Sequence, residues 1–316
     1  MLNLKKIIQK DFFFKNKKLS QVSFIDLSEN KKNYSDTFFE EYKRYPKIQL
    51  DSFNKLKINK NRFYQNSQWQ KYDLKNKNIL EIGSGAGKFT EILLQTNCNL
   101  ITTDVNDSIK VNYKNNFKKR YLKKVCFIKE NIDQVIFKKN IFDYIVLYGV
   151  LQNVDKQKNL IKKCIYYLKK GGKLTLDVTK GNKFYLHLIN PKFFWRMIFK
   201  RMSTNNIYKI VNFLVPKFIS LDTFLKKNLN GLGRVISKII FPFPLINYYF
   251  LPLKNQMKLK MSILDTFDGL ASKFDKPLTV KALKNMIKSI ENELNLKFTK
   301  VEIIEQKKLI ILNVIL

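Results

Sequence analysis

The chain has 316 residues, of which 45% are hydrophobic and 27% are charged, a composition typical of globular proteins and not of disordered ones. Its three cysteines, Cys98, Cys126 and Cys164, have no paired spacing, which excludes a disulfide framework and a cysteine-only zinc site. The single histidine, His187, excludes a metal centre with several histidine ligands. We therefore expect no metal site.

The formal net charge is +35, which first suggests a nucleic-acid partner. However, only 6 of the 60 basic residues are arginine, and arginine is the residue whose planar guanidinium usually recognises phosphates and bases. Lysine, asparagine, isoleucine and phenylalanine are all abundant, as in chains with a biased coding composition. We interpret the charge as lysine spread over the solvated surface and keep a charge-driven function as the alternative.

The N-terminal residues 1–18 lack the apolar stretch of a signal peptide. The most apolar stretch, 235–253, contains one lysine and three prolines, which argue against a membrane-spanning helix. A buried lid segment or an interfacial segment fits this stretch better. Together with the unpaired cysteines, these features predict a cytoplasmic protein.

Residues 1–72 are polar and aromatic with little periodicity, and we expect an N-terminal cap or lid with short helices at 35–50 and 61–71. From residue 76 onward, short apolar runs alternate with helical patterns. The expected strands are 78–82, 99–104, 125–129, 142–149 and 173–178. The expected helices are 88–95, 108–119 and 156–170, the last of which ends at Gly171 and Gly172. This alternation predicts a parallel sheet with helical crossovers.

Regular patterns disappear between about 180 and 278, where six prolines, Pro191 and Pro216 among them, interrupt an aromatic and basic sequence. They return with a helix at 279–294 and strands at 297–305 and 307–316. The last two strands are too close in sequence for a crossover, so they predict an antiparallel hairpin. We expect one α/β domain formed by 73–180 plus 279–316, with an insertion at 181–278 after its fifth strand.

Three glycines, Gly83, Gly85 and Gly87, follow the first expected strand and open a helix. Glycine permits a tight turn and the close approach of a ligand to the backbone, and a helix N-terminus favours electron-rich groups. A dinucleotide fingerprint fails here because Lys88 stands at its third glycine. A P-loop fails because Ile82 stands at its first glycine and the position of its Ser or Thr is also wrong. The remaining pattern is E-x-G-x-G-x-G, beginning at Glu81.

This turn resembles the first motif of class I S-adenosylmethionine-dependent methyltransferases. The resemblance continues with Asp104, 21 residues after Gly83, and with the segments 130–132, 142–153 and 168–174. Fainter likenesses at 49–51, 62–63, 264–268 and 274–279 point to bacterial small-molecule methyltransferases of the methyltransferase-11 type. The resemblance implies an α/β fold, namely a Rossmann-like seven-stranded methyltransferase sheet with a C-terminal antiparallel hairpin and a mainly helical insertion after strand 5.

The resemblance also implies S-adenosyl-L-methionine as cofactor, with Asp104 on its ribose and the 131–132 segment at its adenine. The implied cofactor-binding residues are Glu81, Gly83, Ser84, Gly85, Gly87, Asp104, Val105, Asn131, Ile132, Tyr148 and Gln152. Three positions depart from the family pattern. Asn131 stands where many members have Asp, Gln152 where His is common, and Lys170 where Pro is usual.

Methyl transfer from a sulfonium is an in-line displacement, so the enzyme mainly aligns the acceptor, the methyl group and the sulfur. We leave the catalytic residue unassigned, with His187 as a candidate base for an oxygen acceptor. Asp177, Asp265 and Asp268 are further candidates, and each also fits the role of a helix cap or an ion-pair partner. Aromatic residues of the insertion, including Trp195 and 248–250, could line an acceptor pocket or pack helices together.

The expected acceptor is a small molecule or a glycan. The alternatives are a membrane-associated lipid or quinone methyltransferase, an RNA methyltransferase, and an interaction protein without enzymatic activity. The charge supports nucleic acid, but the segment 148–151 lacks the Asn/Asp-Pro-Pro-aromatic motif of exocyclic-amine methyltransferases. We therefore expect no nucleic-acid substrate and allow a peripheral membrane contact through lysine clusters and the 235–253 stretch.

Overall fold

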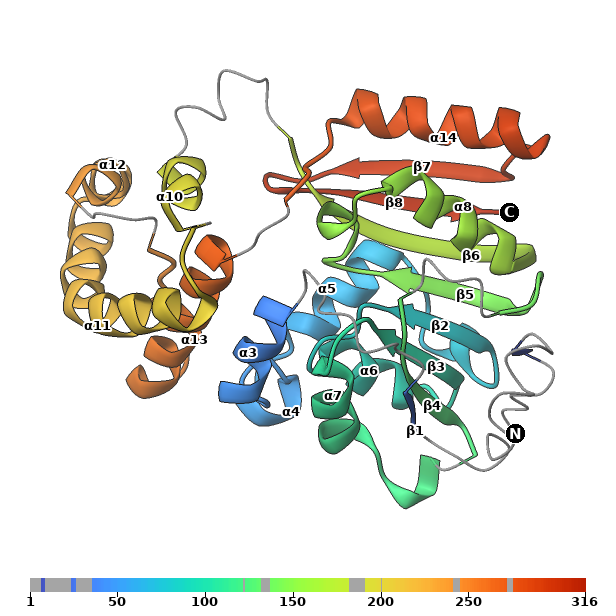
Figure 1. Ribbon diagram of the computed structural model, residues 1–316, viewed down its shortest axis with the longest axis horizontal. Coiled ribbons are helices and arrows are strands. Elements are labelled where there is room, and N and C mark those ends of the chain that lie inside the picture. Colours follow the sequence, from blue (N-terminus) through green and yellow to red (C-terminus); the bar gives the residue numbers. More distant parts are fainter. Residues whose placement is uncertain are drawn as a thin grey trace. The chain divides into compact units, whose positions relative to one another are not determined.

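The computed structural model describes residues 7–8, 24–26, 36–121, 123–131, 137–181, 191–199, 201–240, 245–271 and 275–316. The chain, drawn as a ribbon in Figure 1, divides into two compact units. Each unit has its own hydrophobic core. Unit 1 consists of Met1–Ser35, Leu50–Gly181 and Phe274–Leu316. Unit 2 consists of Asp36–Gln49 and Asn182–Lys273.

Unit 1 is built on a mixed sheet whose strand order is β1-β4-β3-β2-β5-β6-β8-β7. Its strands are β1 (Phe24–Asp26), β2 (Asn78–Ile82), β3 (Asn99–Asp104), β4 (Val125–Lys129), β5 (Phe142–Leu147), β6 (Leu168–Thr179), β7 (Lys300–Glu305) and β8 (Leu309–Ile315). The pairs from β1 to β6 are parallel, and β8 pairs antiparallel with both β6 and β7. The predicted parallel sheet and C-terminal hairpin are therefore confirmed.

The sheet has eight strands in the described residues, so the prediction of seven is wrong. The additional strand is β1, which extends the sheet beyond β4 through the pairs Phe24↔Phe127 and Asp26↔Lys129. A three-residue strand is too short to show an alternating pattern. Its position is decided by a partner about a hundred residues away in sequence, and no local signal marks it.

Helices cover both faces of the sheet, as in doubly wound α/β folds. One face packs against α8 (Gln157–Tyr167) and α14 (Val280–Leu294). The other face packs against α5 (Ile58–Ser67), α6 (Lys88–Leu94) and α7 (Ser108–Asn116). Neighbouring residues of a strand point to opposite faces of the sheet. In β2, Ile79 belongs to the core on the side of α5, α6 and α7, and Leu80 belongs to the core on the side of α8 and α14.

The junction between α8 and β6 differs from the prediction. The helix ends at Tyr167 and β6 begins at Leu168, so Gly171 and Gly172 lie within a strand and do not stop a helix. Pairing with β5 shifts register between Phe142 and Tyr144, and Gly171 has a φ of 74°. The Gly171 N–H donates to the carbonyl of Leu316 at 2.7 Å. Backbone pairing with β5 and with the C-terminal segment has therefore overridden the helical periodicity of the sequence.

Unit 2 is mainly helical in its described residues, as expected for the insertion. Its helices are α3 (Asp36–Arg44), α10 (Pro191–Phe199), α11 (Thr204–Asn228), α12 (Asn230–Ile240) and α13 (Asn255–Ala271). Two distant parts of the sequence meet in this unit, because the hydroxyls of Tyr45 and Tyr208 lie 2.9 Å apart and Arg44 stacks 4.0 Å from the Tyr208 ring centroid.

Two prolines that were expected to break regular structure do not do so. Pro191 is the first residue of α10, where its missing N–H has no intrahelical partner to lose. Pro216 lies inside α11, where the buried Val211 and Val215 before it belong to the core of unit 2 and the partly buried Ile219 after it packs against that core. Within the described residues, no helix combines the length and the hydropathy needed to cross a bilayer.

Candidate cofactor site

The loop between β2 and α6 requires glycine at its key positions. Gly83, Gly85 and Gly87 have φ values of 71°, 54° and 91°. Residues other than glycine rarely adopt such values. A Cβ atom on Gly87 would lie 2.1 Å from Asn112 Oδ1 and 2.2 Å from Asn116 Nδ2. The N–H groups of Gly83 and Ser84 both donate to the carbonyl of Thr103, at 2.9 and 3.1 Å. The loop is thereby fixed to the end of β3.

Asp104 is the last residue of β3, and its carboxylate joins two loops. It accepts hydrogen bonds from the N–H of Gly85 at 2.8 Å and from the N–H of Asn106 at 3.3 Å. Burial raises the pKa of Asp104 to about 6, and the N–H of Gly85 opposes that rise. A carboxylate oxygen can accept more than one hydrogen bond, so this group can still bind vicinal hydroxyls. Val105 directly follows it in the chain.

Glu81 lies in β2 on the sheet face that α6 and α7 cover, and its carboxyl group is only partly satisfied. Its Oε2 accepts hydrogen bonds from the hydroxyls of Thr90 and Thr102, at 2.5 and 2.9 Å. Its Oε1 is buried and accepts no hydrogen bond from the described residues. Burial raises the pKa of Glu81 to about 7, and the nearby Asp104 adds to the rise. This carboxyl therefore changes its charge near neutral pH.

A buried polar layer beneath the glycine loop was not predicted. Asn112 donates to the hydroxyls of Thr90 and Thr102, at 2.7 and 3.3 Å. Asn116 donates to Asn112 Oδ1 at 2.8 Å and to the carbonyl of Gly87 at 2.9 Å. The spacing of Asn112 and Asn116, one helical turn apart beside the buried Ile109, is the signal that could have revealed the layer.

The ends of β4 and β3 are connected at the third predicted site segment. The N–H of Glu130 donates to the carbonyl of Asp104 at 2.9 Å, and the N–H of Asn131 donates to Glu130 Oε1 at 2.6 Å. Asn131 therefore directly follows Glu130, the residue that is hydrogen-bonded to the backbone of Asp104. Two predicted residues, Ile132 and the candidate base His187, lie outside the described residues.

Tyr148 and Gln152 differ in their surroundings. The Tyr148 hydroxyl lies 2.9 Å from Thr175 Oγ1 inside the core, and its ring contacts Phe63 and Phe89. Gln152 lies in the short 3-10 helix Leu151–Asn153, where its buried Oε1 accepts no hydrogen bond from the described residues. The structure therefore places the Tyr148 hydroxyl within the protein interior and leaves an amide oxygen of Gln152 available to a ligand.

Asp177, which the sequence offered as a base, a cap or an ion-pair partner, is an ion-pair partner. Its side chain is fully buried and forms an ion pair with Arg62 of α5. Its Oδ1 accepts a hydrogen bond from the N–H of Gly149 at 2.6 Å. In unit 2, Asp265 accepts a hydrogen bond from the Tyr248 hydroxyl. Arg62 was not predicted as a site residue, because its partner is distant in sequence.

These residues fit a nucleoside that carries a positive charge. The hydroxyl of Ser84 and the Oε1 of Glu81 are buried polar atoms without a partner in the described residues. The glycine backbone allows close approach of a ligand, and Asp104 offers acceptor oxygens at the same loop. The two carboxyl groups provide local negative charge in a chain whose overall charge is +35.

Residues 80–176 match the family model described as "Methyltransferase domain". This segment contains the glycine loop, Asp104, Asn131 and the Tyr148–Gln152 region. Residues 80–176 are a methyltransferase domain of the methyltransferase-11 family. The methyltransferase domain thus includes every described residue that the sequence assigned to the cofactor.

Curated relatives match a part of the chain that is 121 residues long. Ubiquinone biosynthesis O-methyltransferases of several Coxiella burnetii strains are 28% identical over 121 residues, which is 38% of this chain and 51% of theirs. The chain therefore spans about half the length of these relatives.

Solved structures of methyltransferases show a distant similarity. The 1,6-didemethyltoxoflavin-N1-methyltransferase of Burkholderia thailandensis is 10% identical, with a TM-score of 0.40 over 76% of this chain and 71% of that one. The phosphoethanolamine N-methyltransferase 1 of Haemonchus contortus is 18% identical, with a TM-score of 0.37 over 47% and 33%.

Proposed function

We propose that the protein is an S-adenosyl-L-methionine-dependent methyltransferase that transfers a methyl group in-line to a small-molecule or glycan acceptor. The observation that carries this proposal is the hydrogen bond that the N–H of Gly85 donates to the Asp104 carboxylate at 2.8 Å, within a methyltransferase domain. This bond holds a carboxylate against the glycine loop, which is the geometry needed to bind ribose hydroxyls beside a closely approaching backbone.

In this proposal the protein binds the donor and excludes water from it, and the sulfonium supplies the activated methyl group. Asp104 binds the ribose, Asn131 lies at the adenine, and the glycine loop supports the amino-acid portion. Glu81 and Asp104 stabilise the positive charge of the donor before transfer and less so after it, because the product thioether is neutral. The aligned approach of the acceptor is what accelerates the reaction.

A quinol or phenol oxygen is the second acceptor class. The curated relatives are named as ubiquinone biosynthesis O-methyltransferases, which favours an aromatic hydroxyl over a carbon or nitrogen acceptor. The match covers 51% of the length of those relatives, so we give their acceptor class to this chain as a proposal.

Isothermal titration with S-adenosylhomocysteine tests the cofactor site. We expect wild-type protein to bind, and we expect Asp104→Ala to weaken binding by about 1–3 kcal/mol, the usual cost of leaving polar groups without their partner. Asp155→Ala is the matched control, because the Asp155 side chain is 71% exposed and pairs with a surface lysine, Lys276. If wild-type protein does not bind, or if both variants lose affinity equally, the cofactor site is wrong.

A screen with radiolabelled donor tests the acceptor. The arms are glycans, small phenols, quinols and RNA, each incubated with wild-type protein and with Asp104→Ala. Label that transfers to a phenol, quinol or glycan only with the wild type supports the proposal. Transfer to RNA alone would replace it with the nucleic-acid alternative.

A further inference from the structure

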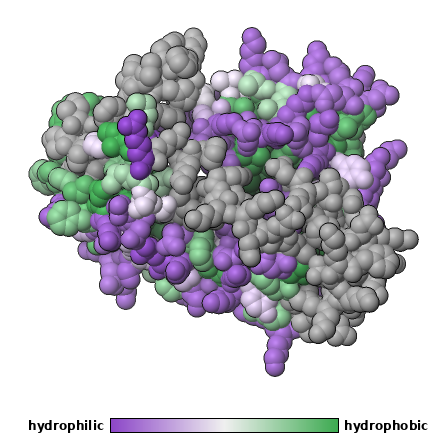
Figure 2. Space-filling model, viewed as in Figure 1, coloured by the Kyte–Doolittle hydropathy of each residue, from purple (hydrophilic) through white to green (hydrophobic). Residues whose placement is uncertain are grey.

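Unit 2 exposes an unusual amount of apolar surface on α11 and α12. Phe213, Leu221 and Phe224 of α11 are 60%, 43% and 59% exposed, and Leu232 and Val235 of α12 are 63% and 55% exposed. Figure 2 shows hydrophobic side chains gathering over these two helices. We call these five residues the apolar α11–α12 face. Isolated exposed apolar residues are ordinary, but a cluster of this kind marks an interaction site.

The helical spacing on α11 explains why these side chains point to solvent. The buried residues Ile207, Val211 and Val215 follow each other at intervals of four and form the inner side of the helix. Phe213, Leu221 and Phe224 fall on other positions of the turn and form an outer stripe. The outer side of α11 therefore carries large apolar side chains beside polar ones such as Asn212 and Lys217.

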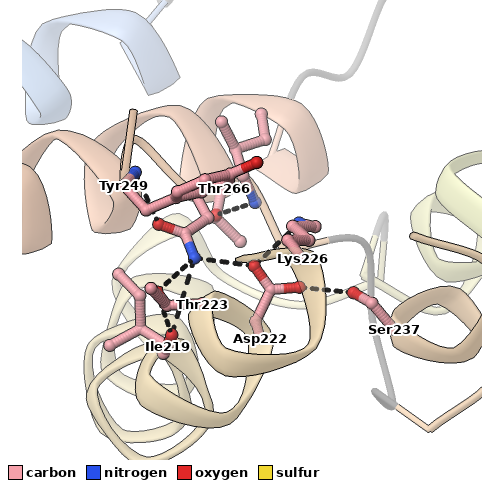
Figure 3. A network of polar contacts seen from close by, with 9 residues as sticks. Ile219, Asp222, Thr223, Lys226, Ser237, Tyr249 and Thr266 are labelled. Atoms are coloured by element: carbon pink, nitrogen blue, oxygen red, sulfur yellow. Dashed lines mark hydrogen bonds and ion pairs between the residues drawn. The ribbon is translucent and has the colours of Figure 1, made fainter. Parts of the chain in front are cut away.

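The orientation of α12 is fixed by close packing and a buried polar network. A Cβ atom on Gly233 would lie 1.9 Å from the carbonyl oxygen of Leu225, so α12 approaches the end of α11 at backbone distance. Ser237 donates a hydrogen bond to the fully buried Asp222 of α11, as Figure 3 shows. Lys226 pairs with the same carboxylate at 2.7 Å.

Asn247 completes this network from outside the two helices. Its side-chain amide donates to Asp222 Oδ2 at 2.7 Å and to Thr223 Oγ1 at 2.9 Å. The segment around Asn247 is thus held against α11 on the side where Asp222 is buried. Gly233 and Ser237 lie on the inner side of α12, against α11. Leu232 and Val235 therefore lie on its outer side, although α12 is firmly packed.

The exposed charged residues that α11 and α12 themselves carry all have one sign. Lys217, Lys227 and Arg234 are exposed on the same two helices. The ammonium of Lys217 lies 3.6 Å from the centroid of the Phe213 ring. The sole acidic residue in the sequence from 204 to 240 is Asp222, which is fully buried and paired. These two helices therefore contribute aromatic and aliphatic groups between cations, and among their described residues they contribute no exposed carboxylate.

This combination fits one class of partner. A second copy of the chain would bring cations against cations at a net charge of +35 each, which opposes association through this surface. A nucleic acid would use the cations and could stack on the aromatic rings, but it would leave the aliphatic Leu221, Leu232 and Val235 unused. An anionic lipid surface uses both components, because apolar side chains enter the acyl boundary while cations contact the headgroups.

We propose that the apolar α11–α12 face, with Lys217, Lys227 and Arg234, docks unit 2 onto an anionic membrane surface. The helices lie on the surface and do not cross it. This docking is a property of unit 2 alone and needs no methyl transfer, so it stands or falls independently of the proposed enzymatic activity.

Vesicle co-sedimentation of the whole chain tests the apolar component. Vesicles of equal parts phosphatidylcholine and phosphatidylglycerol should bind the wild type, and vesicles of phosphatidylcholine alone should bind it much less. Phe213→Ser with Phe224→Ser should reduce partitioning by about tenfold or more, because two large apolar side chains no longer enter the acyl boundary. Phe53→Ser with Tyr72→Ser is the matched control, since these aromatic residues of unit 1 are 48% and 76% exposed.

A second pair of variants tests the cations. Lys217→Gln, Lys227→Gln and Arg234→Gln together should weaken binding to anionic vesicles and reduce its salt dependence. Lys281→Gln, Lys284→Gln and Lys288→Gln remove the same charge from exposed positions of α14 and should leave binding nearly unchanged. Every substituted residue is exposed, so we expect each variant to remain folded. Circular dichroism melting of all variants checks this.

Four outcomes would overturn the proposal. The first is no binding of the wild type to anionic vesicles. The second is an equal loss for the α11–α12 variants and their controls, which would show general charge attraction. The third is a dimer in sedimentation velocity that Phe213→Ser with Phe224→Ser abolishes, which would assign the face to a second copy. The fourth is release of the protein from vesicles by a short RNA that binds the wild type but not the double serine variant.

Discussion

Arg62 and Asp177 form an ion pair although 115 residues separate them in sequence. The Asp177 side chain has no solvent exposure, and the Arg62 side chain is 32% exposed. The second oxygen of the carboxylate accepts the N–H of Gly149. One buried group therefore joins α5, β6 and the turn after β5, and that turn carries part of the candidate site.

Removing Arg62 should destabilise unit 1 strongly. Arg62→Ala leaves the Asp177 carboxylate buried without its counter-charge, and we expect a loss of about 2–4 kcal/mol, reduced somewhat because a third of the arginine side chain contacts solvent. Chemical denaturation measures the change in the free energy of unfolding. Lys276→Ala removes the pair with the exposed Asp155 and should cost less than about 1 kcal/mol. Equal losses for the two variants would contradict the structural role of Arg62.

The ionisation of Glu81 should make the unliganded protein less stable as pH rises. Below the ordinary pKa of 4.5, the folded and unfolded states are both protonated, whereas in the folded state burial raises the pKa to about 7. Between these two values the unfolded chain releases its proton first, so the free energy of unfolding falls, and it levels off above about pH 7. The total effect is roughly 3 kcal/mol.

Glu81→Gln should remove most of this slope. Asp104, whose pKa burial raises to about 6, retains a smaller slope of the same sign in the variant, because it also binds its proton more tightly in the folded state. Denaturation curves between pH 5 and pH 8 in matched buffers compare the two proteins. If the two profiles are parallel, the Glu81 carboxyl is ionised in the folded state throughout this range.

The same carboxyl should make donor binding depend on pH. Under the proposed function, the sulfonium of S-adenosylmethionine is attracted to Glu81 and Asp104 only when they are ionised. Affinity for S-adenosylmethionine should therefore rise by about tenfold from pH 6 to pH 8, and the neutral S-adenosylhomocysteine should show a smaller rise. Titration calorimetry measures both ligands. A rise that is equal for the two ligands, or that persists in Glu81→Gln, would separate these carboxyl groups from the sulfonium.

Gly87→Ala should disrupt the polar layer under the loop. The new methyl group would meet the amides of Asn112 and Asn116 at a residue whose φ is 91°, and we expect a cost on the order of 2–4 kcal/mol. Gly171→Ala is the control, because Gly171 has a φ of 74° but no heavy atom near its Cβ position. It isolates the backbone cost of about 1 kcal/mol. Thermal unfolding that ranks the two variants equally would argue against the packing of α7 on the loop.

The parts of the fold that the sequence predicts best are those with dense local signals. The apolar runs at 78–82, 99–104 and 125–129 coincide with β2, β3 and β4, because a buried parallel strand is hydrophobic throughout and is bounded by polar residues. The glycine loop was found for the same reason, since its chemistry lies within a few consecutive residues.

The features that were missed depend on partners far away in the chain. β1 is held by β4, the end of α8 is set by pairing with β5, and Arg62 is positioned by Asp177. Pro216 was interpreted as a break because a proline in a helix interior is unfavourable locally. Tertiary packing of the residues around it decides otherwise. Periodicity contains no information about such long-range contacts.

The position of β8 has a consequence for how the protein is made. β8 pairs with both β6 and β7, yet four helices of unit 2, α10 to α13, lie between β6 and β8 in the chain. During translation, α10 to α13 leave the ribosome while the edge of β6 still lacks this neighbour. The helices of unit 2 can fold early through contacts that are near in sequence, whereas the open edge must avoid other nascent chains until β8 arrives. Slowing synthesis between α13 and β8 should therefore promote aggregation.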